Sequence, residues 1–306
     1  MNDSPYGPWQ NTDLSPSKMK IYNDCTQKFK YRYVDKIRGP TGGAALQGSS
    51  LHEIFLEEFL VGGIQDVDTL LDMMEMDLKH RLDTQDPRDY KTGLPLTEGE
   101  KAEFILQLRI WGKSLLEAMM KGEDHYGNKL DLPNVTETEV EGCVEVYLPR
   151  ADTTVRLRGY IDLVFEDGSI GDLKLASDYW LAVWTLAKAL SEHQPAMYAK
   201  MTGLNNFRYL IADKKKNRAG PQEASIRCID LRVTEKMHEN LMKTLEEFVM
   251  VTDVLNGYEN GIFKPNPEYN GQSKANAGQT KTNFCGKLCD YKEMCFEENF
   301  SQEESA

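Results

Sequence analysis

Cysteine and histidine are scarce in this chain of 306 residues, with six and five copies, and long apolar runs are missing. A helix that crosses a bilayer needs about 20 predominantly apolar residues, so no membrane-spanning segment is expected. The first residues are polar and lack the apolar core of a secretory signal peptide. These absences favour a soluble protein of a reducing, cytoplasmic compartment and argue against disulfides.

Positive charge is also in deficit, because 36 Lys and Arg face 49 Asp and Glu and leave a formal net charge of −13. Binding of an anionic partner would therefore depend on a local patch of positive charge or on bound cations. One basic segment, residues 18–38, holds seven Lys and Arg interleaved with aromatic residues. Such a mixture suits single-stranded nucleic acid. The alternative is an amphipathic helix with Phe29 and Tyr33 in the core and its lysines in water.

Strand and helix patterns alternate along the chain, which indicates an α/β fold. Residues 1–13 are expected to form an arm, residues 36–47 a loop and residues 214–218 a solvated turn. Ser15-Pro16 predicts a helix start, with Ser as the cap and Pro at the first position. Residues from about 50 to 125 are expected to form a helical subdomain. Strands are predicted at about 136–149, 154–165, 169–175, 206–212 and 224–232, and helices at about 190–202 and 234–258.

The most informative segment combines an acidic residue in an apolar run, a turn and an Asp-x-Lys sequence. An Asp-Gly pair between the two apolar runs predicts a β-hairpin, with Asp162 on the first strand and Asp172 and Lys174 on the second. Side chains alternate along a strand, so Asp172 and Lys174 share one face. A divalent cation relieves the repulsion between two carboxylates, and a nearby Lys can orient or deprotonate water. These groups suit phosphodiester hydrolysis; a plain hairpin with solvated acids is the alternative.

The cysteines are unevenly distributed. Three lie close together near the C-terminus, at Cys285, Cys289 and Cys295, and Cys25 stands alone near the N-terminus. Closely spaced thiolates can surround one soft metal centre, and a distant fourth ligand can complete it. Zinc and an iron–sulfur cluster both suit four thiolates. Cys143 and Cys228 lie in strand-like runs and are expected to be buried apolar side chains.

Five sequence elements stand in a defined order. They are Leu14–Lys18 leading to Cys25, Gly48–His52, Asp162 followed by Asp172-Leu173-Lys174, Gln194–Tyr198, and the cysteine trio. In this the chain resembles, from about residue 14 to residue 296, the RecB-like branch of the PD-(D/E)xK nuclease superfamily. That branch includes the AddB-type nuclease domain, the Cas4 exonucleases and many phage exonucleases. The trio here is spaced C-x3-C-x5-C, whereas the family usually has C-x2-C-x5-C.

The resemblance implies one nuclease domain over residues 1–306. Its core would be a restriction-endonuclease-like mixed sheet flanked by helices, with a helical insertion and a cluster-binding segment at 264–296. The resemblance also implies a [4Fe–4S] cluster on Cys25, Cys285, Cys289 and Cys295. Mg²⁺ or Mn²⁺ would be held by His52, Asp162, Asp172 and the carbonyl of Leu173. The catalytic set would be Asp162, Asp172, Lys174, Gln194 and Tyr198.

Some of these residues have competing interpretations. A lone histidine such as His52 is commonly a surface residue, and Glu53 could instead be the acid that reaches the site, or a solvated first-turn residue. Gln194 and Tyr198 lie one helical turn apart and share a face, from which they can reach a phosphate or the catalytic Lys. A helix surface with a core Tyr is the alternative. His193 is expected to be structural.

The expected activity is that of a metal-dependent DNA exonuclease acting on single strands or duplex ends in recombination, repair or phage replication. The setting would be a bacterial cell or a phage-infected host, with a recombination or replication protein as a candidate partner. A silent nuclease-like subunit that binds DNA or protein, and an RNA-processing nuclease, are the alternatives. The Asp…Asp-x-Lys set argues against the first, because a silent site has no need of mutually repelling carboxylates.

Overall fold

The computed structural model describes residues 13–254 except 40, 90–91, 125, 178–183 and 218–219. Near the C-terminus it describes Phe263, Cys289, Tyr291, Met294, Cys295, Glu297 and Glu298. The N-terminal arm predicted for residues 1–13 therefore lies almost wholly outside the described residues, and so does Cys285.

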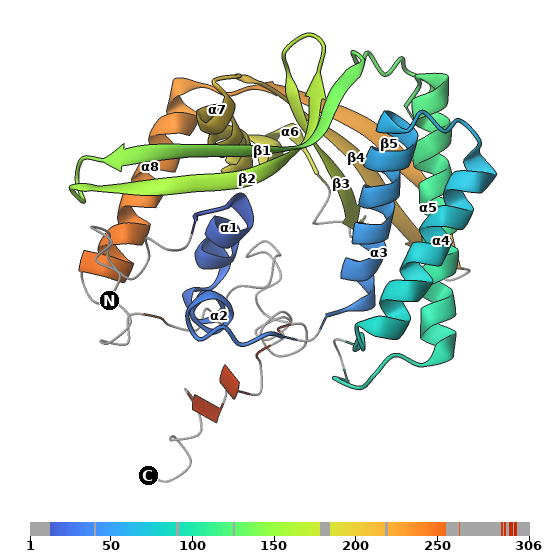
Figure 1. Ribbon diagram of the computed structural model, residues 1–306, viewed down its shortest axis with the longest axis horizontal. Coiled ribbons are helices and arrows are strands. Elements are labelled where there is room, and N and C mark those ends of the chain that lie inside the picture. Colours follow the sequence, from blue (N-terminus) through green and yellow to red (C-terminus); the bar gives the residue numbers. More distant parts are fainter. Residues whose placement is uncertain are drawn as a thin grey trace.

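A mixed sheet with strand order β1-β2-β3-β4-β5 forms the centre of the molecule (Figure 1). The strands are β1 (Val135–Leu148), β2 (Thr153–Phe165), β3 (Ile170–Ser177), β4 (Asn206–Asn217) and β5 (Gly220–Arg232). β3 and β4 run parallel, and the other neighbours are antiparallel. The α/β class and the mixed sheet predicted from the sequence are confirmed.

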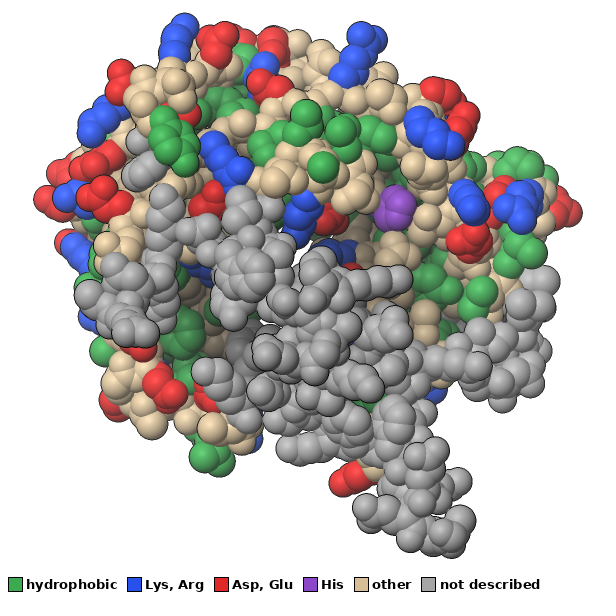
Figure 2. Space-filling model, turned by 180° about the vertical axis from the view of Figure 1, so that it is seen from behind, with side chains coloured by type: hydrophobic (Ala, Val, Ile, Leu, Met, Phe, Trp, Pro, Cys, Tyr) green, Lys and Arg blue, Asp and Glu red, His purple; other side chains and the backbone are tan. Residues whose placement is uncertain are grey.

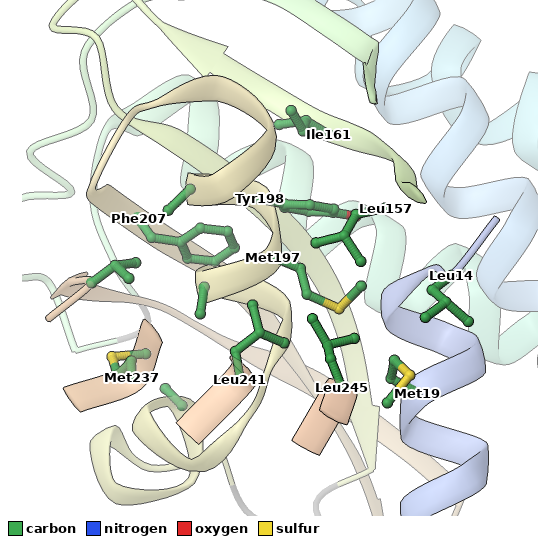
Figure 3. Close-up of a cluster of buried hydrophobic side chains, with 14 of the residues drawn as sticks. Leu14, Met19, Leu157, Ile161, Met197, Tyr198, Phe207, Met237, Leu241 and Leu245 are labelled. Carbon is green, nitrogen blue, oxygen red and sulfur yellow. The ribbon is translucent and has the colours of Figure 1, made fainter. Parts of the chain in front are cut away.

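Helices cover both faces of the sheet (Figure 1). One layer contains α3 (Gly43–Glu53), its π-helical continuation η2 (Ile54–Val61), α4 (Val67–Thr84) and α5 (Glu98–Lys121). The opposite layer contains α1 (Pro16–Asp24), α6 (Leu186–Ser191), α7 (Gln194–Thr202) and α8 (Glu235–Val249), which continues as η3 (Met250–Val254). Each layer buries its own apolar core against the sheet. Figure 3 shows the core on the α7 and α8 side, where Met197 and Phe207 lie close to Leu241.

Local sequence accounts for several element boundaries. The hydroxyl of Ser15 accepts from the backbone N–H of Lys18, and Pro16 occupies the first turn, so α1 begins where the Ser-Pro pair predicts. Thr97 and Glu100 form a reciprocal capping box at the start of α5. Gly168 adopts φ +75° in the turn between β2 and β3, which is the backbone state that the Asp-Gly pair predicts. The helical segment predicted for residues 50–125 is confirmed, with α4 and α5 as its longest parts.

β2 and β3 pair over only a short stretch. Their register joins Leu163 with Gly171 and Val164 with Ile170, and the two strands then separate. The open edge of β2 is partly occupied by Leu14, whose N–H donates to the carbonyl of Arg156 and whose carbonyl accepts from the N–H of Arg158. The strand separation places a gap in the sheet directly after the hairpin turn.

Some local predictions are wrong. The loop predicted for residues 36–47 ends early, because α3 begins at Gly43, where an added Cβ would lie 2.4 Å from the ring of Phe104. That glycine serves close packing and does not break the helix. Lys214–Asn217, predicted as a turn, belongs to β4. The predicted helix at 190–202 is divided into α6 and α7, and Cys143 is exposed on β1 while Cys228 is half-buried.

Two aromatic residues of the basic N-terminal segment are buried, and Tyr22 and Tyr33 are half-buried. Phe29 and Tyr31, in α2 (Thr26–Phe29) and η1 (Lys30–Val34), are each 1% exposed, and Phe29 packs edge to face against Phe248 of α8. Of the two interpretations of this segment, the structure favours the amphipathic one. Side chains of both charges are intermixed on the face shown in Figure 2. Within the described ranges, no helix is long and apolar enough to cross a membrane.

Candidate active site

Three carboxylates lie in one row across three adjacent strands, at the point where β2 and β3 separate. Thr138 pairs with Leu163 and Val140 with Ile161, so Glu139 of β1 stands opposite Asp162 of β2. Asp172 of β3 stands opposite Asp162 on the other side, one position beyond the last paired residues. Glu139 adopts φ +51°, a conformation that is uncommon outside glycine and that clusters at functional sites. The row concentrates negative charge in a gap of the sheet.

His52 of α3 lies between two of these carboxylates. Its Nε2 is 2.9 Å from Oδ2 of Asp162, and its Nδ1 is 3.3 Å from Oε1 of Glu139. Burial by itself lowers the pKa of His52, but the hydrogen bond to Asp162 and the charges of the nearby carboxylates raise it overall. Ligand atoms of His52, Glu139 and Asp162 all lie within 4.8 Å of one another, a spacing that can hold a metal ion.

Asp172 is 2% exposed, although it carries an ionisable group. Burial raises its pKa to about 7, Lys174 opposes that rise and the charge of Asp162 adds to it. Its Oδ2 forms an ion pair with Nζ of Lys174 at 2.6 Å. The side chain of Gln194 donates to Oδ1. The Asp172 carboxylate is therefore held between a cation and an amide donor.

The Gln194 and Tyr198 pair lies on one face of α7, as the one-turn spacing predicts. The Gln194 side-chain amide donates to the Tyr198 hydroxyl at 3.2 Å, and this hydroxyl donates to the carbonyl of Tyr160 at 2.5 Å. The ring of Tyr198 is buried in the apolar core (Figure 3). Burial and the nearby carboxylates raise the pKa of Tyr198 far above its usual value. Tyr198 therefore stays protonated and serves as a hydrogen-bond donor.

Two cavities meet at this row of carboxylates. One, of about 590 Å³, is lined by Ser15, Ser17, Lys18, Arg158 and Tyr160 together with Asp162, Asp172 and Lys174. The other, of about 740 Å³, is lined by the exposed edge of α3, by Glu139 and by Arg81. His52, Tyr160 and Leu173 line both. The first cavity gives an extended ligand access to the carboxylates and to Lys174.

The backbone of Leu173 also takes part in the site. Its N–H donates to Oδ2 of Asp162 at 2.9 Å. This bond fixes the orientation of the Asp162 carboxylate, because the same oxygen also meets His52. The Leu173 side chain is buried in the core under α3, on the face opposite Asp172, as the alternation of the strand predicts.

Glu53, the alternative acid, and His193, which was expected to be structural, both lie away from the carboxylates. Glu53 forms an ion pair with Arg81 on the surface and does not join the row. His193 lies near Thr244 of α8, 3.4 Å from its hydroxyl, and burial lowers its pKa. Sequence reasoning missed Glu139, because acidic residues alternate along β1 and only the register with β2 distinguishes this one.

The cysteine segment lies beside the N-terminal helices. The hydroxyl of Tyr31 donates to Glu298 at 2.6 Å, and the hydroxyl of Tyr291 donates to the carbonyl of Ile37 at 2.9 Å. Cys25 is 8% exposed at the junction of α1 and α2, and Cys289 and Cys295 are half-buried. Tyr291 and Glu298 are therefore in contact with the region that follows Cys25. The described cysteines form no disulfide with one another.

Comparison with known proteins agrees with this geometry. The family model of the PD-(D/E)XK nuclease superfamily matches residues 13–296. The chain therefore belongs to the PD-(D/E)XK nuclease superfamily, whose members cleave nucleic acids. The Asp172-Leu173-Lys174 sequence has the form of the motif from which the superfamily takes its name.

Two solved structures illustrate how far the likeness extends. A Eubacterium rectale protein described as a "putative exonuclease" is 14% identical, with 87% of this chain and 88% of that chain covered and a TM-score of 0.48. The protein SSO0001 is 13% identical, with 77% and 84% covered and a TM-score of 0.29. No curated protein matches the sequence.

The burial of Asp172 predicts a pH-dependent stability in metal-free protein. Folded Asp172 keeps its proton to about pH 7, whereas unfolded Asp172 loses it near pH 3.8. The unfolded state thus binds fewer protons between these values, and the stability contributed by this group falls as the pH rises through that window. In EDTA, Asp172→Asn should gain stability over the parent across this window, by a few kcal/mol at most, at roughly 1.4 kcal/mol per pKa unit.

Thermal unfolding at pH 5, 6, 7 and 8 measures this difference. The matched control is Asp131→Asn, at a side chain that is 93% exposed, and it should show no pH-dependent gain. Mn²⁺ at pH 8 should stabilise the parent and leave Asp172→Asn unchanged. If the thermal stability of the parent and of Asp172→Asn changed with pH in parallel, the raised pKa of Asp172 would be contradicted.

Proposed function

We propose that this protein is a divalent-metal-dependent DNA exonuclease that hydrolyses phosphodiester bonds at single strands or duplex ends in recombination, repair or phage replication. The observation that carries the proposal is the row of three carboxylates beside Lys174, in a cavity that continues onto basic side chains. Held so close without a cation, these acids repel one another. Their retention in one row is explained by a function that uses them.

The donor set fits Mg²⁺ or Mn²⁺. Carboxylate and carbonyl oxygens are the ligands that these hard cations prefer, and ligand atoms of His52, Glu139 and Asp162 lie within 4.8 Å of one another. We assign Asp162, Asp172, His52 and the carbonyl of Leu173 as the groups that would hold the ion. A bound divalent cation supplies positive charge for the reacting phosphate and lowers the pKa of a water ligand.

The remaining residues orient the reaction. Lys174, which lies against Asp172, would hold the attacking water by its positive charge and assist its deprotonation. Gln194 fixes the Asp172 carboxylate by a hydrogen bond, and Tyr198 anchors Gln194 to the backbone of β2. Gln194 and Tyr198 are thus positioning residues of the catalytic set.

One assay tests the proposed activity. Purified protein is incubated with labelled linear single-stranded DNA, duplex DNA and RNA, with EDTA, Mg²⁺ or Mn²⁺, and with closed circles of the same sequences. We expect metal-dependent loss of terminal nucleotides from linear DNA and no cleavage of circles. Cleavage of circles would make the protein an endonuclease, and preferential cleavage of RNA would favour the RNA-processing alternative. Absence of all cleavage would favour the silent subunit.

Glu139 is a further positioning residue of this site. A histidine that binds a metal through one ring nitrogen commonly donates from the other to a carboxylate, which fixes its tautomer, and Nδ1 of His52 faces Glu139. Glu139→Gln should weaken Mn²⁺ binding about 10-fold or more, as measured by electron paramagnetic resonance titration. Glu145→Gln, at an exposed position on the same strand, is the control. Unchanged Mn²⁺ affinity in Glu139→Gln would remove Glu139 from the site.

We also propose that Cys25, Cys285, Cys289 and Cys295 hold a structural [4Fe–4S] cluster. Support comes from the contacts of Tyr31 and Tyr291, which bring the segment of Cys289 and Cys295 against the helices that flank Cys25. Four thiolates are the usual ligand set of such a cluster. Its role would be to join the two ends of the chain.

A further inference from the structure

The outer face of β2 leads away from the carboxylate row as a line of cationic and aromatic side chains. Arg156, Arg158 and Tyr160 are exposed, and they alternate with the buried Leu157, Gly159 and Ile161. By the same alternation the line continues to Asp162 of the candidate active site. The position of these residues on a paired strand makes their spacing rigid.

Tyr160 stands out on this face because it is a large aromatic side chain that is 52% exposed. Core packing therefore does not account for its type. Its backbone carbonyl accepts a hydrogen bond from the hydroxyl of Tyr198. That hydroxyl accepts one from the side-chain amide of Gln194, which also donates to Asp172. The backbone that carries the ring is thus held at a fixed place relative to the carboxylates, and Tyr160 lines both cavities. A base stacked on Tyr160 would be fixed relative to the scissile bond.

Positive groups gather farther along the same line. Arg156 and Arg158 both pair with Asp13, and Lys18 donates to the backbone carbonyl of Asp13. Arg158 also pairs with Glu141. Glu145 stands opposite Arg156 in the strand register, so the three cations balance three carboxylates in a chain whose net charge is −13. Lys18 and Arg158 line the same cavity as Asp172 and Lys174.

We propose that Tyr160, Arg158, Arg156 and Lys18 form the binding track for the single-stranded DNA next to the scissile phosphate, an inference that rests on the proposed function. One base would stack on Tyr160, and phosphates would replace Asp13 and Glu141 as partners of the cations. Aromatic platforms combined with a cationic groove are the usual means of binding single strands. Arg158 lies four residues from Asp162, or about 13 Å, which spans roughly four stacked nucleotides.

Binding of a fluorescein-labelled 20-nucleotide single strand, measured by anisotropy in EDTA so that cleavage cannot interfere, tests the track. Tyr160→Ala should weaken binding roughly 5- to 100-fold, and Tyr160→Phe should restore it, because stacking needs the ring and not the hydroxyl. Arg156→Gln/Arg158→Gln should reduce the salt dependence of binding by about 0.7 in log–log slope for each phosphate that the two arginines no longer neutralise.

Two controls match these variants. Tyr147→Ala removes an exposed tyrosine of the neighbouring strand, and Arg150→Gln removes an exposed arginine at the far end of the hairpin. Both should bind like the parent, and all variants should unfold at the parent's temperature. The track would be overturned if the Tyr160 and arginine variants bound the single strand with the parent's affinity and salt dependence. It would also be overturned if these variants lost duplex binding and kept single-strand binding.

The same experiment separates the track from the proposed function. If the parent binds single strands through these residues but hydrolyses no DNA in Mg²⁺ or Mn²⁺, the exonuclease proposal fails and the track stands. If the parent degrades DNA and the track variants degrade and bind DNA as well as the parent, the track fails and the exonuclease proposal stands. If the track variants bind a 20-nucleotide RNA as weakly as they bind DNA, the track stands but is not restricted to DNA.

Discussion

Asp172→Ala should abolish DNA cleavage, and Lys174→Ala should reduce turnover by roughly 10²- to 10⁴-fold, the range typical of a lost general base or charge-stabilising group. Asp172 is buried, and the charge of the nearby Asp162 helps to raise its pKa, so Asp172→Ala would take away one of the two facing carboxylates proposed to hold the cation. Lys174→Ala leaves both carboxylates in place and should retain Mn²⁺ binding. Lys174→Ala should therefore lower kcat more than it changes KM for DNA.

The assay is hydrolysis of labelled linear DNA in Mg²⁺ and Mn²⁺, with circular dichroism as the check on folding. Lys200→Ala, at an exposed position on α7, and Asp131→Ala are the matched controls and should cut at the parent's rate. Both site variants should still bind DNA, because phosphate contacts are spread over many residues. Parent-like cleavage by both site variants would disprove the active-site assignment and favour the silent-subunit alternative.

Cys25→Ala should give colourless protein with a large loss of stability. A [4Fe–4S] cluster makes a protein brown, and loss of one of four ligands should remove most of its bound iron. Between the described N-terminal and C-terminal segments, contacts such as Tyr31 with Glu298 and Tyr291 with Ile37 would remain. The variant should unfold several degrees below the parent, since each 1 kcal/mol corresponds to about 2–4 °C in a chain of this size class.

Iron and zinc analysis of anaerobically purified protein, with its visible spectrum, measures this effect. Cys143→Ala is the control, because Cys143 is exposed on β1, away from the proposed ligand set. Its iron content should match the parent's. Colourless parent protein that is replete with zinc would replace the cluster by a zinc site and leave the nuclease fold intact.

The sequence was sufficient for the elements that have strong local signals. The Asp-Gly turn, the Ser-Pro cap of α1 and the alternation along β2 and β3 each depend on a few neighbouring residues, and all three are confirmed. The juxtaposition of Asp162, Asp172 and Lys174 followed from that hairpin. The roles assigned to these residues stay predictions until the variants are measured.

The features that sequence reasoning missed depend on contacts between distant segments. Glu139 joins the site through the register of β1 with β2, and α3 begins at Gly43 because Phe104 of α5 leaves no room for a side chain. The aromatic N-terminal segment resembles a stacking surface in sequence, but Tyr22 and Phe29 pack against Phe248 of α8 and Tyr31 packs against Tyr291. Each case requires knowledge of a partner that local periodicity does not contain.

The separation of β2 from β3 has a further consequence for how this protein avoids self-association. A strand that loses its neighbour exposes N–H and C=O groups, which can pair with an edge of another molecule and start aggregation. Leu14 takes up the N–H and C=O groups that face it on β2 at Arg156 and Arg158. At these two residues the open edge of β2 is thus closed to a foreign strand by Leu14, which lies just ahead of α1.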